Sequence, residues 1–112
     1  MGNDREYLLD ILVAARLALT YLKDKTEEEF SLDTECQDAV IRRLEVIGEA
    51  ARRLSLAARS SLPNLAWDEM IAMRNVMIHQ YDHMDITIVW DTVRNNLPQL
   101  IETLEKIVPP ER

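Results

Sequence analysis

The sequence predicts an all-α protein, an antiparallel bundle of four to five helices, and three observations lead to this. Apolar residues recur at every third or fourth position along most of the chain, which is the spacing of a helix with one buried face. Only two glycines occur in 112 residues, and no stretch alternates apolar and polar residues as a half-buried strand does. No internal repeat or glycine-rich phosphate loop appears either, which leaves a helix bundle.

Length and composition predict a single domain that spans residues 1–112. A chain of this size with 47% hydrophobic residues suits one real core and leaves little room for a second. The one cysteine, Cys36, cannot form an internal disulfide, which fits a reducing compartment, and we expect it to be a small apolar core residue. The N-terminus does not resemble a signal peptide, and no apolar run approaches the roughly 18 residues of a membrane span. We therefore expect a soluble, cytoplasmic protein.

The first half of the chain contains two long predicted helices. One covers residues 4–25, and the other begins at Asp33 or Thr34 and continues to about residue 54. Between them, residues 26–29 form a predicted capping box that opens a short turn, with Phe30 as its apolar contact. The predicted buried stripes are Leu8, Ile11, Leu12, Ala15, Leu19 and Leu22 in the first helix, and Val40, Leu44, Ile47, Ala51 and Leu54 in the second.

Shorter elements are expected next. Ser55 is a suitable cap for a short helical segment that ends at Ser60, and residues 61–64 form a connection. A third long helix is expected at residues 66–79, and residues 82–85 are polar and turn-like.

The last helix should begin after Asp85, which is a good N-cap. An interior proline removes a hydrogen bond and clashes with the preceding turn, so a kink or a restart is expected at residues 95–98. Pro109 and Pro110 should end the helix. Its predicted buried stripe is Val89, Trp90, Val93, Leu97, Leu100, Ile101, Leu104 and Ile107.

The residue types suited to chemistry gather between Trp67 and Asp85. Arg74, Asn75, His79 and Tyr81 place a permanent cation, an amide, an imidazole and a phenol among apolar side chains. An arginine binds phosphate with a planar fork of donors, and an imidazole with an unperturbed pKa of about 6.5 exchanges a proton near neutral pH.

The spacing of Arg74, four residues, His79, one residue and Tyr81 resembles the signature of the HepT-like branch of the HEPN superfamily. These are small helical proteins that act as ribonuclease toxins in prokaryotic toxin–antitoxin pairs. The resemblance implies a HEPN-like fold, RNA as substrate, Arg74 and His79 as catalytic residues, and an active site at a homodimer interface. Further stretches fall in the family's order and extend the resemblance over nearly the whole chain: residues 42–51, Pro63 followed by Trp67, residues 86–90 and Leu97-Pro98.

Helix geometry bears on how the motif residues meet. At about 100° per residue, Tyr81 lies near the face of Arg74, whereas His79 lies about 140° away. Either the helix ends or bends around His79, or the Arg74 and His79 that act together come from two chains. Cleavage of RNA through its 2′-hydroxyl requires a proton acceptor, a proton donor and a cation for the phosphorane. A symmetric dimer would supply two of each residue without a metal or other cofactor, and His83 is an alternative second proton carrier.

Tyr81 has a further role that the resemblance implies. In the HepT-like family a partner antitoxin, a minimal nucleotidyltransferase, transfers AMP to the tyrosine of the motif. An adenylate beside Arg74 would occupy the place of the substrate phosphate. The alternative is a phenol that only packs against the last helix.

Two other readings of the motif remain open. In the first, the chain is a non-catalytic helical partner of a nucleotidyltransferase, presents its motif tyrosine to it, and uses Arg74 to hold a nucleotide phosphate. In the second, His79 and His83, four residues apart, bind a metal with Asp82 or Asp85. Arg74 and His79 could also satisfy carboxylates or carbonyls at a helix end, and Asn75 could orient His79 or be a surface amide.

The charge balance opposes general nucleic-acid binding. The formal net charge is -7 and the pI is about 4.8, so any RNA contact must be local. The alternative for the central arginines is that they are solvated charges paired with Glu45 and Glu49. These arginines are Arg42, Arg43, Arg52, Arg53, Arg59 and Arg74. Met70, Met73 and Met77 form a helical stripe and are expected to pack in the core or at a dimer interface. Trp67 and Trp90 are expected to be core anchors, and the alternative is a ring edge that stacks on an RNA base.

Overall fold

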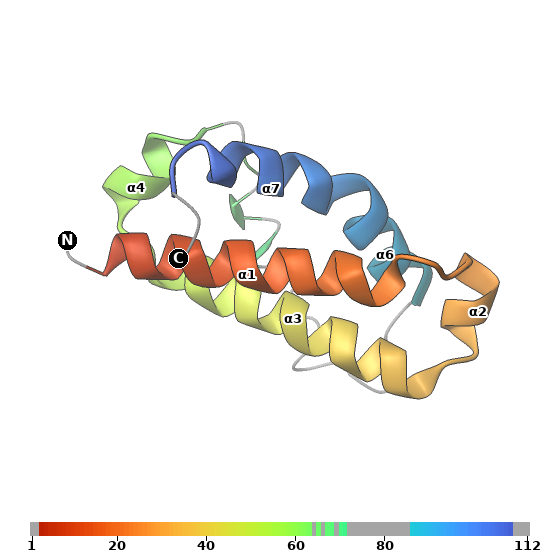
Figure 1. Ribbon diagram of the computed structural model, residues 1–112. Helices are drawn as coiled ribbons and strands as arrows, with labels where there is room; N and C mark the ends of the chain where they lie inside the picture. The colour runs from red at the N-terminus through yellow and green to blue at the C-terminus, as the bar shows by residue number, and fades with distance from the viewer. Residues whose placement is uncertain (1–2, 64, 66, 69, 72–85, 109–112) are drawn as a thin grey trace.

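A computed structural model describes residues 3–63, 65, 67, 68, 70, 71 and 86–108. Helices account for every regular element in these residues, and no strand occurs among them, so the predicted all-α bundle is confirmed (Figure 1). The elements are α1 (Asp4–Leu22), α2 (Glu27–Ser31), α3 (Thr34–Arg53), α4 (Leu56–Ser60), α6 (Ile86–Asp91), the π-helical segment η2 (Thr92–Asn96) and α7 (Leu97–Glu105).

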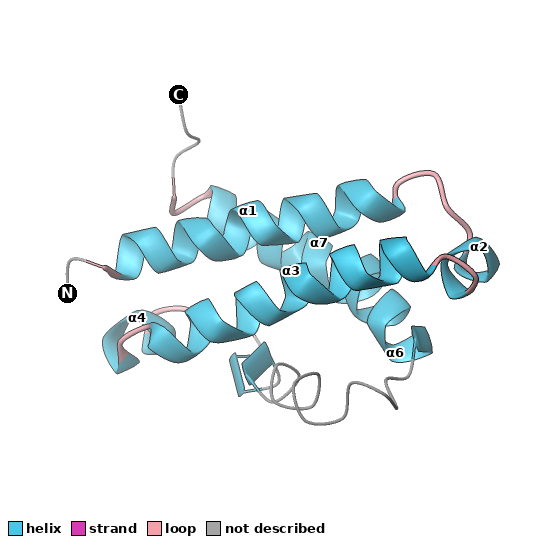
Figure 2. Cartoon of the chain, turned by 90° about the horizontal axis from the view of Figure 1, so that it is seen from below, coloured by secondary structure: helices cyan, strands magenta, loops and turns pink. Residues whose placement is uncertain are grey.

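Helices α1 and α3 form the centre of the bundle and run antiparallel to each other (Figures 1 and 2). The chain reverses between them at α2, where the predicted capping box is confirmed. The Glu29 N–H donates to the Thr26 hydroxyl at 3.0 Å, and the Thr26 N–H donates to the Glu29 carboxylate at 2.9 Å. Phe30 is fully buried beneath this turn. Helix α1 ends at Leu22, earlier than the expected residue 25, because the residues that follow are polar and have no core to face.

The predicted stripes of α1 and α3 form the core. The four predicted positions within α3 and its C-cap Leu54 are all buried, and in α1 only Leu19 is partly exposed. Helix α7 packs along α1, and its buried residues close the same core from the other side. The Arg16 guanidinium of α1 reaches the Glu105 carboxylate of α7 at 2.7 Å on the surface of this contact. One continuous apolar cluster therefore joins the two halves of the chain.

Ser55 caps α4 as predicted, because its hydroxyl accepts a hydrogen bond from the Ala58 N–H at 3.0 Å. Trp67 is buried and helical, and its indole N–H donates to the Leu62 carbonyl at 3.0 Å, so its role as a core anchor is confirmed. Most of the helix expected at residues 66–79, the turn at 82–85 and the cap at Asp85 lie outside the described residues.

The interruption expected at residues 95–98 is present as the π-helical segment η2, after which α7 begins at Leu97. Pro98 falls in the first turn of α7, where its missing N–H leaves no broken bond. The expected end of the stripe is wrong: Ile107 is 44% exposed, and Val108 is 1% exposed in its place. Helix α7 ends at Glu105, before Pro109, so helical periodicity no longer applies to Ile107.

Among the described residues, no helix is long and apolar enough to cross a membrane.

Candidate functional site

The residues to which the sequence assigns chemistry lie in one stretch of the chain that is not described. Arg74, Asn75, His79, Tyr81 and His83 all fall within residues 72–85. Their roles therefore stay predictions. The structure does describe the segments that come directly before and after this stretch in the sequence. It also describes arginines outside the stretch that could contact RNA.

Both flanks of the stretch are fixed to the core. On its N-terminal side Trp67 is buried and bonded to Leu62, and Ile71 packs against the core cluster. On its C-terminal side α6 packs against α2, and the rings of Trp90 and Phe30 lie 5.7 Å apart between centroids at a tilt of 40°. The predicted motif therefore lies between two anchored helical segments.

Three of the central arginines are paired with carboxylates of their own helix, as the alternative reading of the sequence proposed. Arg52 and Arg53 both contact Glu49, with shortest distances of 3.4 Å and 2.9 Å. Arg42 lies 4.0 Å from Glu45, at the outer limit of an ion pair. The Glu49 carboxylate, with a smaller contribution from Tyr7, raises the pKa of the Arg53 guanidinium. These pairs neutralise much of the positive charge that the sequence places on α3.

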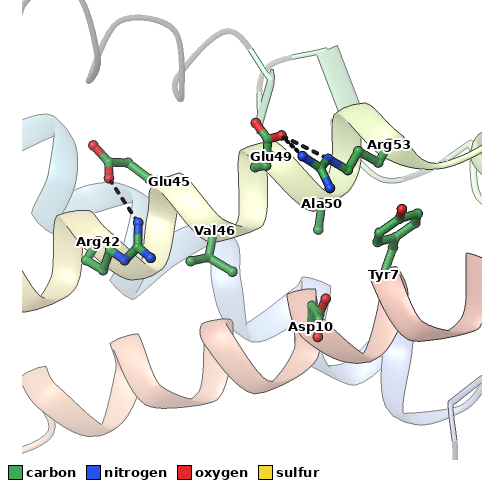
Figure 3. Close-up of a pocket in the computed structure, with 8 residues that line it drawn as sticks. All are labelled: Tyr7, Asp10, Arg42, Glu45, Val46, Glu49, Ala50 and Arg53. Atoms are coloured by element: carbon green, nitrogen blue, oxygen red, sulfur yellow. Dashed lines mark hydrogen bonds and ion pairs between the residues drawn. The ribbon is translucent and has the colours of Figure 1, made fainter. Parts of the chain in front are cut away.

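A pocket of about 280 Å³ lies between α1 and α3 and includes two of these pairs (Figure 3). The Arg42–Glu45 and Arg53–Glu49 pairs form the α3 side, and Tyr7 and Asp10 form the α1 side. Three carboxylates face two guanidiniums in this pocket, so its formal charge is negative. A phosphate group would therefore meet net repulsion there, and the pocket is poorly suited to RNA.

Arg94 is in a different environment, which the sequence analysis did not recognise. Its guanidinium carbon lies 5.3 Å from the centroid of the Trp90 ring, within the range of a cation–π contact. The two residues are four positions apart, so they lie one helical turn from each other. That i, i+4 spacing of a tryptophan and an arginine is a signal the sequence contains. Trp90 itself packs against the core, as predicted.

Cys36 has a structural role. It is partly buried against the core, and its Sγ lies 3.7 Å from the Tyr21 carbonyl oxygen, to which its thiol donates. Burial raises the pKa of the Cys36 thiol, which disfavours the thiolate that a cysteine nucleophile needs.

No group of three or more histidine, cysteine, aspartate or glutamate side chains converges as a metal site among the residues that the structure covers. His79 and His83, the ligands of the alternative metal reading, lie outside that part of the chain.

An all-α antiparallel bundle with an Arg-x4-His-x-Tyr sequence ahead of its last helices defines a small helical domain of the HEPN type. Comparison with known families agrees and is more specific. Residues 11–107 match the family described as ribonuclease HepT-like, and the chain belongs to this family.

Curated relatives cover nearly the whole chain. A probable ribonuclease HepT of Thermococcus cleftensis is 36% identical over 105 residues, which are 94% of this chain and 96% of that protein. A candidate RNase of Methanocaldococcus jannaschii is 36% identical over 101 residues, 90% of this chain and 93% of that protein.

A third relative is longer than this chain. A γ-glutamylcyclotransferase and candidate RNase of Methanocaldococcus jannaschii is 39% identical over 102 residues, and the chain spans 46% of its length. No solved structure gives a significant match.

Proposed function

We propose that this chain is a metal-independent endoribonuclease, the toxin of a prokaryotic toxin–antitoxin pair. The observation that carries the proposal is the match to the ribonuclease HepT-like family over residues 11–107, a range that includes Arg74, His79 and Tyr81. Relatives named as ribonucleases and aligned over at least 90% of this chain support the same activity. Because the substrate is RNA, the proposal places the enzyme in the cytoplasm.

The proposed reaction uses the 2′-hydroxyl of the RNA as the nucleophile. His79 of one subunit accepts its proton, the 2′-oxygen attacks phosphorus, and His79 of the partner subunit protonates the departing 5′-oxygen. Arg74 from each subunit stabilises the negative charge of the phosphorane. The products carry a 2′,3′-cyclic phosphate and a 5′-hydroxyl, so atoms and protons balance without a metal.

Two arguments support a site shared by two subunits. The chain has two histidines, and only His79 belongs to the motif. On a regular helix, Arg74 and His79 of one chain point about 140° apart, so two chains related by a two-fold axis bring them together more readily than one. Asn75 lies one turn before His79 and would orient the imidazole or the phosphate.

Tyr81 would be the control point of the enzyme. A cognate nucleotidyltransferase antitoxin would transfer AMP from ATP to the phenol oxygen and release pyrophosphate. The attached phosphate would pair with Arg74 and exclude the substrate phosphate. Co-expression with that antitoxin should add adenylate mass to a Tyr81 peptide, and Tyr81→Phe should lose it. Undiminished adenylylation of Tyr81→Phe would assign the modification to another residue.

The deciding experiment is RNA cleavage by the purified protein in the presence of a chelator. His79→Ala should lower the rate about 10²- to 10⁴-fold, which is the usual contribution of a positioned proton carrier. Arg74→Ala and Arg74→Lys should also fail, because a lysine cannot reproduce the bidentate fork of the guanidinium. A 2′-deoxy substitution at the scissile nucleotide should block cleavage.

Other outcomes favour the other readings. If His79→Ala cleaves RNA as fast as the parent, the proposed catalytic role is wrong. If the wild-type protein does not cleave RNA but is adenylylated, it is a non-catalytic partner of the nucleotidyltransferase. If the chelator abolishes cleavage, the histidine-based metal site replaces the proposed mechanism.

A further inference from the structure

The described arginines of this acidic protein differ in the groups that their guanidiniums contact. Arg16, Arg42, Arg52 and Arg53 lie within ion-pair distance of a glutamate. An arginine in such a pair has part of its donor fork occupied and its charge compensated, so a phosphate would have to displace the carboxylate. With a net charge of -7, RNA binding depends on the cations that carry no such partner.

Arg94 is held by an aromatic ring instead of an acid. Its guanidinium lies over Trp90 at 5.3 Å, and the Trp90 ring is braced by Phe30 at 5.7 Å. Asp91, the last residue of α6, lies three positions before Arg94, yet no carboxylate of the described chain is in ion-pair contact with Arg94. Unlike a carboxylate, a ring below the guanidinium accepts no bidentate pair of hydrogen bonds from it, so the planar fork of Arg94 is available to a phosphate.

Arg94 lies on a solvent-exposed part of the surface. Arg94 is exposed, and the next two residues, Asn95 and Asn96, are exposed amides in the same π-helical segment. This segment continues α6, which is the first described element after the residues that contain Arg74 and His79. The proline that follows in α7 explains the irregular turn, but it does not explain an exposed guanidinium positioned on a tryptophan.

We propose that Arg94, positioned by Trp90, binds a backbone phosphate of the RNA substrate. The inference rests on the ribonuclease function proposed above and adds to it a substrate-binding residue outside the motif. A guanidinium already fixed on a ring loses less conformational entropy when it binds than a free arginine does, and its planar fork matches two phosphate oxygens. Contacts of this kind strengthen binding without reading the base sequence.

The first test measures binding of single-stranded RNA to the His79→Ala protein, which does not consume the RNA. Arg94→Gln in this background should weaken binding about tenfold and should reduce the slope of log K against log salt by about 0.7, the value of one phosphate contact on a single strand. Arg94→Lys should keep most of the slope and lose part of the affinity, because it keeps the charge without the planar fork.

Arg16→Gln is the matched control. It makes the same change in net charge but removes an arginine whose guanidinium is bound to Glu105 at 2.7 Å. We expect it to leave the slope unchanged. An equal effect of Arg16→Gln and Arg94→Gln would show that only net charge matters, and it would overturn the inference.

The second test uses the active enzyme. Arg94→Gln should raise KM about tenfold and leave kcat unchanged, since a phosphate contact away from the reacting atoms is made equally in the ground and transition states. Suppose that the wild-type protein cleaves RNA and that Arg94→Gln has the same KM and the same salt slope as the parent. This result would overturn the inference about Arg94 and leave the proposed function intact. A wild-type protein that neither binds nor cleaves RNA would overturn both. Thermal melts of each variant separate a loss of folding from a loss of binding.

Discussion

A single serine joins the start of α1 to the beginning of α4. The N–H and the hydroxyl of Ser55 both donate to the Asp4 carboxylate, at 3.0 Å and 2.7 Å, from 51 positions away in the sequence. The same hydroxyl oxygen accepts the Ala58 N–H, so Ser55 caps a helix while it binds a distant one. These hydrogen bonds, the side-chain bond foremost, hold the pKa of the Asp4 carboxyl below its ordinary value.

Asp4 should therefore make stability depend on pH. Because its pKa is lower in the folded state, the carboxylate contributes stability above the unfolded value of about 3.9, and that contribution is lost as pH falls through the folded pKa. We expect Asp4→Asn to melt at a lower temperature than the parent at about pH 7 and to differ less from it at about pH 2.5.

Asp10→Asn provides the control for thermal melts followed by circular dichroism. It removes the same charge from the same helix, at an exposed position with no hydrogen bond to another described residue. A loss for Asp4→Asn that is equal at both pH values, or matched by Asp10→Asn, would contradict the role given to Ser55.

Elements that are regular from end to end are the ones that the sequence predicts well. The predicted stripe residues within α3 are all buried, because its 20 residues follow one helical period. The capping box at Thr26 and the N-cap at Ser55 are equally local, since donor and acceptor lie three residues apart. Local hydrogen bonding and a single period are enough to fix these elements.

The C-terminal helical region has features that the sequence does not predict. The sequence marks the interruption at Pro98 but does not say that it takes the form of a π-helical turn, or that α7 ends at Glu105. As a result, Val108 is buried and Ile107 is exposed. The contact between Trp90 and Phe30 is similarly hidden, because it joins residues 60 positions apart. These features depend on contacts between residues that are far apart in the sequence, so a short segment of sequence does not predict them.

The π-helical turn has a packing role that deletion can test. The buried positions Val89, Val93 and Leu97 follow one another at four residues across η2, more than the 3.6 residues of an α-helical turn, and one wide turn absorbs the excess. Deletion of the exposed Asn95 should therefore restore a regular α-helix with its stripe still in phase. Pro98 would then clash with the preceding turn at a cost of about 3 kcal/mol.

The expected result depends on the residue at position 98. Deletion of Asn95 should destabilise the wild-type protein strongly and the Pro98→Ala protein weakly, with a difference of about 3 kcal/mol in the free energy of unfolding. Urea denaturation of the four proteins measures this coupling. Equal losses with and without Pro98 would show that the turn serves some other purpose than to accommodate the proline.

At the scale of the whole molecule, an acidic bundle must still hold an RNA strand. Glutamates of α3 pair with Arg42, Arg52 and Arg53, which are three of the five described arginines in the central cluster expected from the sequence, and Glu105 of α7 pairs with Arg16. The cations assigned to RNA here are Arg74 and Arg94, both outside α3. A dimer would double their number in one assembly, while the remaining acidic surface would repel RNA that is not correctly placed.

The proposed site shared by two subunits makes a quantitative prediction for mixed dimers. If two His79 residues, one from each subunit, act as base and acid, a dimer with one His79→Ala subunit has lost one proton carrier and is nearly inactive. Total activity should then follow the square of the wild-type fraction, so that in an equal mixture about one quarter of the dimers are active. If each chain acts alone, with His83 as its second proton carrier, activity should follow the wild-type fraction linearly.

The experiment refolds wild-type and His79→Ala chains together at several ratios, confirms dimers by light scattering, and measures RNA cleavage at constant total protein. Mixtures of the wild-type chain with Arg16→Gln control for the refolding step, since both subunits then keep their histidines. A linear dependence, or a monomer that cleaves RNA, would refute the two-subunit site. A quadratic dependence would establish that one catalytic centre draws its acid and its base from different chains, because no single-chain site responds to the identity of its partner in this way.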